Sequence, residues 1–200
     1  GEVANDFFDG GVGTGRVEWQ AADGLSVGLS GRWQEAEIGL PYDFFGLPAP
    51  ERRQESLTRH VALPVSWQRA RGSLEGIAAL VEQEVALSDP DDPFAASRSE
   101  ARSEQLRATV RRLGGERWEL AGGGEWERQR ATSTDAFGGG LADERERREG
   151  LFAQATWRGE RARLEAGVRR DEHDSFGGAT SWRGGGLVRL GDQLRLRASY

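Results

Sequence analysis

The stretch Leu25-Ser26-Val27-Gly28-Leu29-Ser30-Gly31-Arg32-Trp33-Gln34 places Leu, Val, Gly or Trp at odd positions and Ser, Gly, Arg or Gln at even ones. Successive side chains of a β-strand point to opposite faces, so this stretch has one apolar face and one polar face. A barrel strand shows lipid only one face, which keeps its average hydropathy low. The mean hydropathy of −0.65 and the lack of an apolar run near ~20 residues therefore exclude helical membrane spans only.

The same alternation recurs along the chain and predicts ten strands. Several are longer than the roughly five or six residues of an average globular strand. They match the ~9–11 residues that a tilted strand needs to cross a bilayer. The expected ranges are 12–21, 25–38, 57–68, 73–86, 101–112, 117–130, 146–157, 162–172, 180–190 and 193–200.

The expected connections alternate in length. Short turns are predicted at 22–24, 69–72, 114–116, 158–161 and 191–192, and longer polar segments at 39–56, 87–100, 131–145 and 173–179. Outer-membrane barrels have short turns on the periplasmic side and long loops on the extracellular side. The pattern therefore predicts an all-β fold, an antiparallel transmembrane β-barrel.

The seven tryptophans give a second, independent indication of a membrane. Four lie within about three residues of a predicted short turn, and the other three lie about nine to eleven residues from one. Nine residues of a tilted strand advance roughly 20–25 Å along the barrel axis. That distance matches an apolar band ~25 Å tall between two aromatic girdles, where indole rings meet the interface. We expect the first girdle to contain Trp19, Trp67, Trp118 and Trp157, and the second Trp33, Trp126 and Trp182.

The polar faces of the predicted strands carry many charges, which cannot pack inside a small closed core. They indicate a wide, hydrated interior, and ten strands without a closing partner indicate that further strands are missing. These charged residues are Arg16, Glu18, Arg32, Glu75, Glu119, Glu125, Glu127, Glu165, Arg169, Arg195 and Arg197.

The composition excludes several classes of function. The 200 residues contain no Cys, which excludes disulfides and thiol chemistry. All 27 basic residues are Arg, interleaved with carboxylates at a net charge of −6, which argues against nucleic-acid binding. The chain has no Met and begins with Gly1, as expected of an internal fragment.

Four segments of the chain form recognisable motifs, namely Gly150-Leu151-Phe152-Ala153-Gln154 followed by Trp157, Glu165–Asp174, Leu194–Tyr200 and Gly39-Leu40-Pro41. They resemble segments of TonB-dependent outer-membrane receptors of the cobalamin and ferric-siderophore type. The first is similar to the family's "GLFAQ…W" strand, the second to its "GLRYDDH" strand with Arg170 in place of the usual Tyr, and the third to its "LRASY" segment. The resemblance covers nearly the whole chain.

The resemblance implies a barrel of 22 strands filled by an N-terminal plug. Residues 1–200 would then be a partial barrel domain of about ten consecutive strands, with the plug and the C-terminal strands absent. The implied function is TonB-coupled uptake of a ferric siderophore or a cobalamin across the Gram-negative outer membrane. It implies a monomer with three partners, which are outer-membrane lipid, the TonB complex through the plug and a small-molecule substrate.

Two kinds of alternative remain open. The first is a passive outer-membrane porin or adhesin, which would use the same barrel without a plug. The second comprises a smaller barrel enzyme and a soluble β-sandwich. No nucleophile–base pair or carboxylate dyad can be defended from spacing, so we expect no enzyme activity, no catalytic residues and no cofactor.

Candidate binding residues are few. Tyr42, Phe44 and Phe45 in the first long segment could stack on a ligand or pack against neighbouring loops. The Asp89–Pro93 segment could bind a hard cation, but Pro and Asp clusters are common in turns. The carboxylates and imidazole of residues 171–174 are expected to be a solvated loop base. We therefore predict no metal site.

Overall fold

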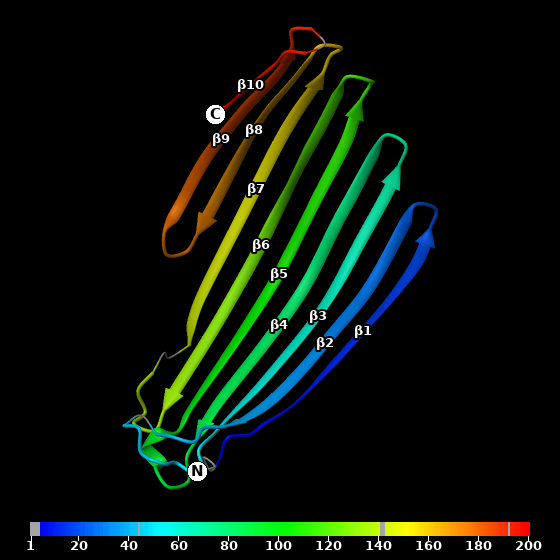
Figure 1. Ribbon diagram of the computed structural model, residues 1–200. Helices are drawn as coiled ribbons and strands as arrows, with labels where there is room; N and C mark the ends of the chain where they lie inside the picture. The colour runs from blue at the N-terminus through cyan, green and yellow to red at the C-terminus, as the bar shows by residue number, and fades with distance from the viewer. Residues whose placement is uncertain (1–4, 44, 141–142, 192) are drawn as a thin grey trace.

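The computed structural model describes residues 5–43, 45–140, 143–191 and 193–200, in which ten strands form one antiparallel sheet. Each strand is hydrogen-bonded to the next along the chain, giving a single curved layer with β1 and β10 at its two edges (Figure 1). In the described part of the chain, no helix is long and apolar enough to cross a membrane. The strands are β1 (Phe8–Ala22), β2 (Leu25–Gly39), β3 (Arg53–Arg69), β4 (Gly72–Ser88), β5 (Ser97–Gly114), β6 (Trp118–Asp135), β7 (Glu144–Arg158), β8 (Ala162–His173), β9 (Gly177–Arg189) and β10 (Arg195–Ser199), and a 3₁₀ helix, η1 (Pro93–Ala95), precedes β5.

The strand register aligns apolar residues and glycines on one face of β2–β9, towards the end with the short turns. A single line of paired residues contains Leu25, Trp67, Leu74, Val110, Gly122, Ala153, Val168 and Trp182. The adjacent line on the opposite face contains Ser26, Ser66, Glu75, Thr109, Gly123, Phe152, Arg169 and Ser181. The first line crosses β3 at Trp67, two residues before that strand ends at Arg69. It crosses β9 at Trp182, seven residues before that strand ends at Arg189. The strands are therefore staggered, as in a tilted barrel wall.

The sheet has almost no buried core of its own. Its accessible surface is 14533 Å², whereas a globular monomer of 21.9 kDa would expose about 9,300 Å². Among the described residues, the buried hydrophobic side chains are Ala49 and Ala62, while Leu29 and Leu120 are about half exposed. The apolar face predicted from the sequence is therefore not covered by a second layer within the described residues, and its contact with lipid stays a prediction.

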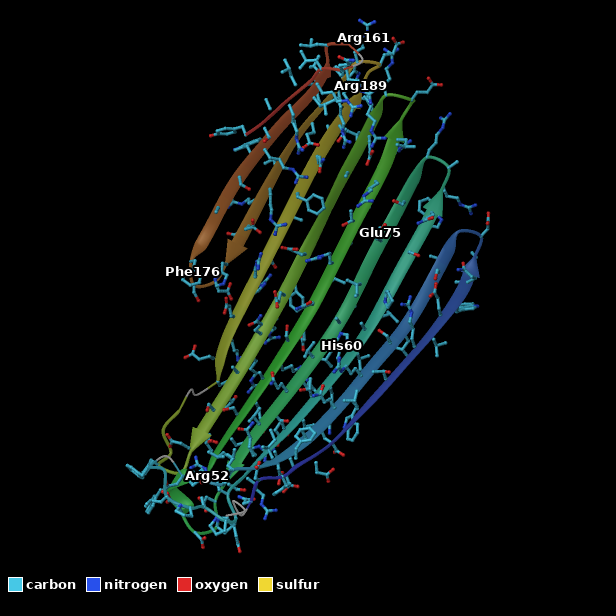
Figure 2. The ribbon with its side chains drawn as sticks, viewed as in Figure 1. Arg52, His60, Glu75, Arg161, Phe176 and Arg189 are labelled. Carbon is cyan, nitrogen blue, oxygen red and sulfur yellow. The ribbon has the colours of Figure 1, made fainter. Side chains whose placement is uncertain are left out.

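The two ends of the sheet differ as predicted. The turns β1–β2, β3–β4, β5–β6, β7–β8 and β9–β10 lie at one end, and the longer connections lie at the other (Figure 1). Arg161 and Arg189 mark the first end and Arg52 the second (Figure 2). The strands reach further into the loops than predicted, because cross-strand pairing of polar residues continues past the apolar pattern. The long connections are therefore residues 40–52, 89–96 and 136–143.

The predicted long segment at 173–179 is wrong. His173 ends β8 and Gly177 begins β9, so only residues 174–176 connect them. Gly177 has a φ of 75°, which permits the tight reversal. The Ser175 N–H donates to His173 Nδ1 (3.1 Å), and the His173 ring packs against Phe176 with centroids 4.6 Å apart.

The two faces can be tested by placing an arginine on each. Leu29→Arg would put a charge on the apolar face and should destabilise the full-length protein by about 2–4 kcal/mol in a bilayer. Ser30→Arg would put the same charge on the polar face and should cost far less. Unfolding in lipid vesicles, followed by tryptophan fluorescence, measures both. Equal losses would contradict the assigned faces.

Candidate functional site

A network of ion pairs occupies the polar face of β5–β8. Its centre is the half-buried Glu125 carboxylate, which Arg107 contacts at 3.2 Å and Arg148 at 3.6 Å. Arg169 also bonds to Glu125, and its Nε and Nη2 donate to Asp171 at 2.8 Å and 2.6 Å. Three guanidinium groups thus share these two carboxylates, and Arg148 also interacts electrostatically with the Glu127 carboxylate two residues along β6.

A glycine makes this network possible. Glu125, Gly150 and Asp171 are register partners on β6, β7 and β8. A Cβ on Gly150 would lie 2.8 Å from Arg169 Nη2 and 3.0 Å from Asp171 Oδ1. The Arg169 side chain therefore passes over β7 where that strand has no side chain, and it joins β6 to β8 directly.

A second polar cluster adjoins the first. The Glu127 carboxylate accepts hydrogen bonds from Gln129 (2.8 Å), Gln105 (3.1 Å) and Ser103 (3.3 Å). Together the two clusters form a continuous strip of charged and amide groups on β5–β8. The groups of this strip can form hydrogen bonds with water, a polar solute or a polar protein segment. Contact with lipid tails would leave them without hydrogen-bond partners, which is unfavourable.

The long connections share a motif that presents a phenylalanine. An Asp-x-Phe motif begins each of three tight turns there, the third starting at Asp135 at the end of β6, and in each the Phe backbone N–H donates to the Asp Oδ1. The distances are 2.9 Å for Asp43 and Phe45, 3.0 Å for Asp92 and Phe94, and 2.9 Å for Asp135 and Phe137. All three rings are strongly exposed, between 65% and 82%. This turn fixes the backbone at each Phe and leaves the ring exposed.

Two of these loops are joined to each other. The Phe94 and Phe137 rings stack with centroids 5.3 Å apart, and the Ala136 N–H donates to the Ala96 carbonyl (3.0 Å). Sequence reasoning missed both phenylalanines, although the repeated Asp-x-Phe motif was a visible signal. The same motif at Asp174 and Phe176 lies apart from these loops, at the β8–β9 turn (Figure 2).

The first loop contains two of the three predicted ligand-binding aromatics within the described residues. Tyr42 pairs with Pro48 as an isolated bridge and is half exposed, and Phe45 is 82% exposed. Phe44 lies outside the described residues. The Asn5 side chain holds this loop by donating to the carbonyls of Leu40 (3.2 Å) and Ala49 (3.0 Å).

The seven predicted girdle tryptophans all lie on the apolar face by register. Trp118 pairs directly with Trp157 near the short turns, and Trp67 pairs with Leu25. Five of the seven are exposed, namely Trp19, Trp33, Trp67, Trp118 and Trp182. Their placement fits the expected girdles, whose role in a membrane stays a prediction.

The acidic segments considered as metal sites are used for local structure. Asp89 Oδ1 accepts from the Asp91 N–H at 3.1 Å, and Asp92 caps η1. The expectation of a solvated loop base at residues 171–174 is wrong for most of that segment, because Asp171 and His173 lie in β8 and bond to Arg169 and Glu146. No group of three metal-ligating side chains occurs within the described ranges.

Asp143 links the loop ends of β6 and β7. Arg145 donates to its carboxylate at 2.6 Å and Arg130 also bonds to it, and together they hold the pKa of Asp143 below its usual range. A lowered pKa means that the ion pairs persist at neutral and mildly acidic pH. They are lost only when the pH falls through that lowered pKa.

Comparison with known protein families shows the family to which this chain belongs. The model of the TonB-dependent receptor-like β-barrel matches residues 4–200. The chain belongs to the TonB-dependent receptor family. No match is found among the curated proteins. Homologous TonB-dependent receptors are outer-membrane β-barrel proteins that act as transporters rather than enzymes, which agrees with the expectation of no enzyme activity.

Solved receptors share the fold at low sequence identity. The siderophore receptor PirA from Pseudomonas aeruginosa is 14% identical with a TM-score of 0.74, covering 96% of this chain and 32% of PirA. PirA from Acinetobacter baumannii is 16% identical with a TM-score of 0.69, covering 100% and 34%. The ferric citrate transporter FecA is 9% identical with a TM-score of 0.67, covering 96% and 35%. This TonB-dependent receptor chain therefore spans about a third of the length of each.

The ion-pair network can be tested by removing its central charge. Glu125→Gln leaves three guanidinium groups around a neutral amide and should lower the free energy of unfolding by about 1–2 kcal/mol. Glu165→Gln is the control, because that carboxylate has one distant partner, Arg163 at 3.9 Å. Urea unfolding of the full-length receptor in lipid vesicles compares them. A loss at Glu165 as large as that at Glu125 would contradict the central role of Glu125.

Proposed function

We propose that the protein containing this chain takes up a ferric siderophore across the Gram-negative outer membrane, with energy from the TonB complex. The family match over residues 4–200 carries this proposal. A ferric chelate is proposed rather than a cobalamin because the receptors compared above are named for siderophores and ferric citrate. TonB would act through a plug domain outside residues 1–200, inside a barrel completed by further strands.

The polar face supports a role in passage. In a closed barrel this face would line the interior, with the Glu125 network on β5–β8 exposed to the plug and the solute. Charged and amide groups there can exchange hydrogen bonds with water as the plug moves. The apolar face would contact lipid, and the two rows of tryptophan would lie at the membrane interfaces. We propose a monomer, because a complete barrel leaves no free strand edge.

The long loops support a role in capture. With the short turns in the periplasm, residues 40–52, 89–96 and 136–143 would face the medium. Tyr42, Phe44 and Phe45 are proposed to contact the ligand, as predicted from the sequence, and the stacked pair Phe94 and Phe137 is added to them. Rigid exposed rings can bind a planar ligand by stacking at small entropic cost.

Iron uptake tests the proposed function directly. Cells lacking their own ferric-siderophore receptors and expressing the full-length protein should accumulate radiolabelled ferric siderophore, and the same cells without TonB should not. Accumulation that does not depend on TonB would indicate a passive pore. Failure with every siderophore and ferric citrate tested would contradict the proposed substrate class.

The loop aromatics can be tested by binding. The double variant Phe94→Ala and Phe137→Ala should weaken ferric-siderophore binding to the purified receptor by roughly tenfold, because ring stacking contributes about 0.5–1.5 kcal/mol per pair beyond buried area. Phe176→Ala is the control, since Phe176 is even more exposed than either ring of the pair but lies apart from these loops. Equal weakening by the control would contradict a specific role for the stacked pair.

A further inference from the structure

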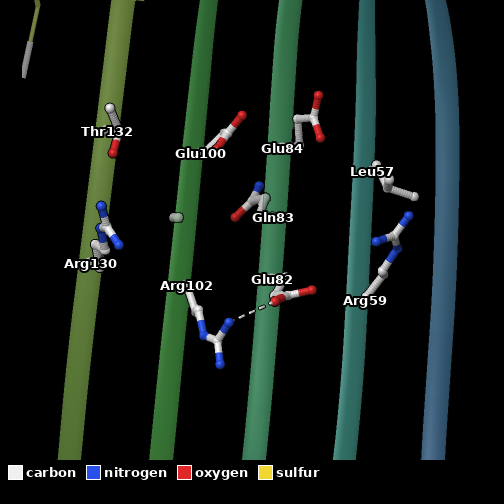
Figure 3. A pocket seen from close by; sticks show the side chains of 10 residues that line it. Leu57, Arg59, Glu82, Gln83, Glu84, Glu100, Arg102, Arg130 and Thr132 are labelled. Atoms are coloured by element: carbon white, nitrogen blue, oxygen red, sulfur yellow. Dashed lines mark hydrogen bonds and ion pairs between the residues drawn. The ribbon is translucent and has the colours of Figure 1, made fainter. Parts of the chain in front are cut away.

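The two ends of the sheet differ in their balance of charge. Towards the long loops, a groove of about 390 Å³ across β3–β6 is lined by three guanidinium groups and three carboxylates, of which Arg102 and Glu82 pair at 3.4 Å (Figure 3). Within four residues of the short turns, the described arginines outnumber the described carboxylates, although the whole chain has a net charge of −6. The short-turn end is therefore basic while the rest of the chain is acidic.

Part of this positive charge has no partner in the sheet. Some arginines at this end are paired, as Arg69 is with Asp23 and Arg158 with Glu119. Four exposed arginines in the turns or on the outward face form no ion pair with any described residue. They are Arg71, Arg112, Arg117 and Arg161.

Hydrogen bonds between neighbouring turns keep these four arginines close together. The Arg71 carbonyl accepts from the backbone N–H of the β5 residue next to Arg112, at 2.9 Å. The Arg117 carbonyl accepts from the backbone N–H of the last residue of β7, at 2.7 Å. The β7–β8 turn that follows this residue contains Arg161 (Figure 2). The four arginines therefore form one basic rim along the turns of β3–β8.

Arg112 faces outward at the depth of the first girdle. Its row of register partners lies between the row of Trp67 and the row of Trp118. If this face contacts lipid, a guanidinium group at this depth is unfavourable unless it meets a charged or polar partner. A soluble protein would not reach between these tryptophans, whereas the headgroup of a lipid lies at that depth.

An apolar groove adjoins the basic rim on the outward face. It has a volume of about 330 Å³ and lies beside the register pair Trp118 and Trp157. The small side chains of Ala155 and Ala166, which pair with each other in the next row, leave it open. That row continues across β6 to Arg112 on β5. An acyl chain in the groove would therefore have its headgroup near the arginines.

We propose that the basic rim binds the phosphate group of an anionic phospholipid of the periplasmic leaflet, with an acyl chain in the groove beside Trp118 and Trp157. This inference rests on the outer-membrane location proposed above, with the short turns in the periplasm. Guanidinium groups bind phosphate through paired hydrogen bonds, and continuity with the groove favours a lipid over a free anion. Glu116 and Glu160 lie in the same turns, so the four arginines still leave an excess of positive charge. This excess favours an anionic headgroup over a zwitterionic one.

Binding of phosphatidylglycerol to the full-length receptor, measured by native mass spectrometry in detergent, tests the proposal. The double variant Arg112→Gln and Arg117→Gln should raise the Kd roughly tenfold. The matched control Arg111→Gln and Arg197→Gln removes the same charge from the same end of the sheet but from the polar face, and should leave the Kd within about twofold. Phosphatidylcholine should bind the wild-type receptor as weakly as phosphatidylglycerol binds the double variant.

The groove is tested by a variant that changes no charge. Ala166→Leu places a larger side chain in the groove and should raise the Kd for phosphatidylglycerol roughly threefold, because the acyl chain loses its contact with the wall. An unchanged Kd in this variant would remove the groove from the proposed site.

Several results would overturn the proposal. An unchanged Kd in the double variant would remove the role of the basic rim, and equal weakening by the control would reduce the effect to net charge. Displacement by millimolar glycerophosphoglycerol, the headgroup without its acyl chains, would replace the lipid by a soluble anion. If the double variant does not fold, Arg112→Gln alone is compared with Arg111→Gln. A wild-type receptor that does not insert into lipid vesicles would instead contradict the proposed membrane location.

Discussion

The structure depends on the continuous hydrogen-bond ladder between neighbouring strands, which has to hold in one register across the whole sheet. Inside the hydrocarbon layer of a membrane, each backbone N–H or C=O group without a hydrogen bond costs several kcal/mol. A strand can therefore cross the membrane only when the neighbouring strands form hydrogen bonds with these groups. A slip of one residue would turn every side chain of a strand to the opposite face. The register line from Leu25 to Trp182 shows that this alignment is kept over β2–β9. The separation of a lipid-compatible face from a polar face follows from it.

Much of this fold could be predicted from the sequence because alternation is a local signal. Leu25–Gln34 already assigns each side chain to a face, and the spacing of turns orders the strands as neighbours. The strand ends were less predictable. Beyond Arg128 in β6, for example, nearly all residues on both faces are polar, so the alternating pattern disappears while the backbone pairing continues. The β8–β9 turn was wrongly extended because Gly177 and the contact between His173 and Phe176 close it in a way that polarity alone does not reveal.

The candidate sites were predicted only in part, for a related reason. Glu125 and Arg169 were recognised as polar-face residues, but their contact depends on the register of β6–β8 and on the missing side chain at Gly150. Arg107 and Arg148 join them through cross-strand neighbours that are far apart in the chain. Phe94 and Phe137 come together because two loops pack against each other. In each case the deciding fact is a distance between strands or loops, which alternation along one strand does not contain.

The passage of Arg169 over β7 has a mechanical consequence. Ladder bonds join only adjacent strands, and a load that slides one strand along the next can break them in succession. A side chain anchored on β8 and bonded to β6 spans two such interfaces, so sliding at either one must also break an ion pair. A barrel wall stiffened in this way would keep its shape when a domain inside the barrel is pulled. The pulling force would then move that domain rather than deform the barrel.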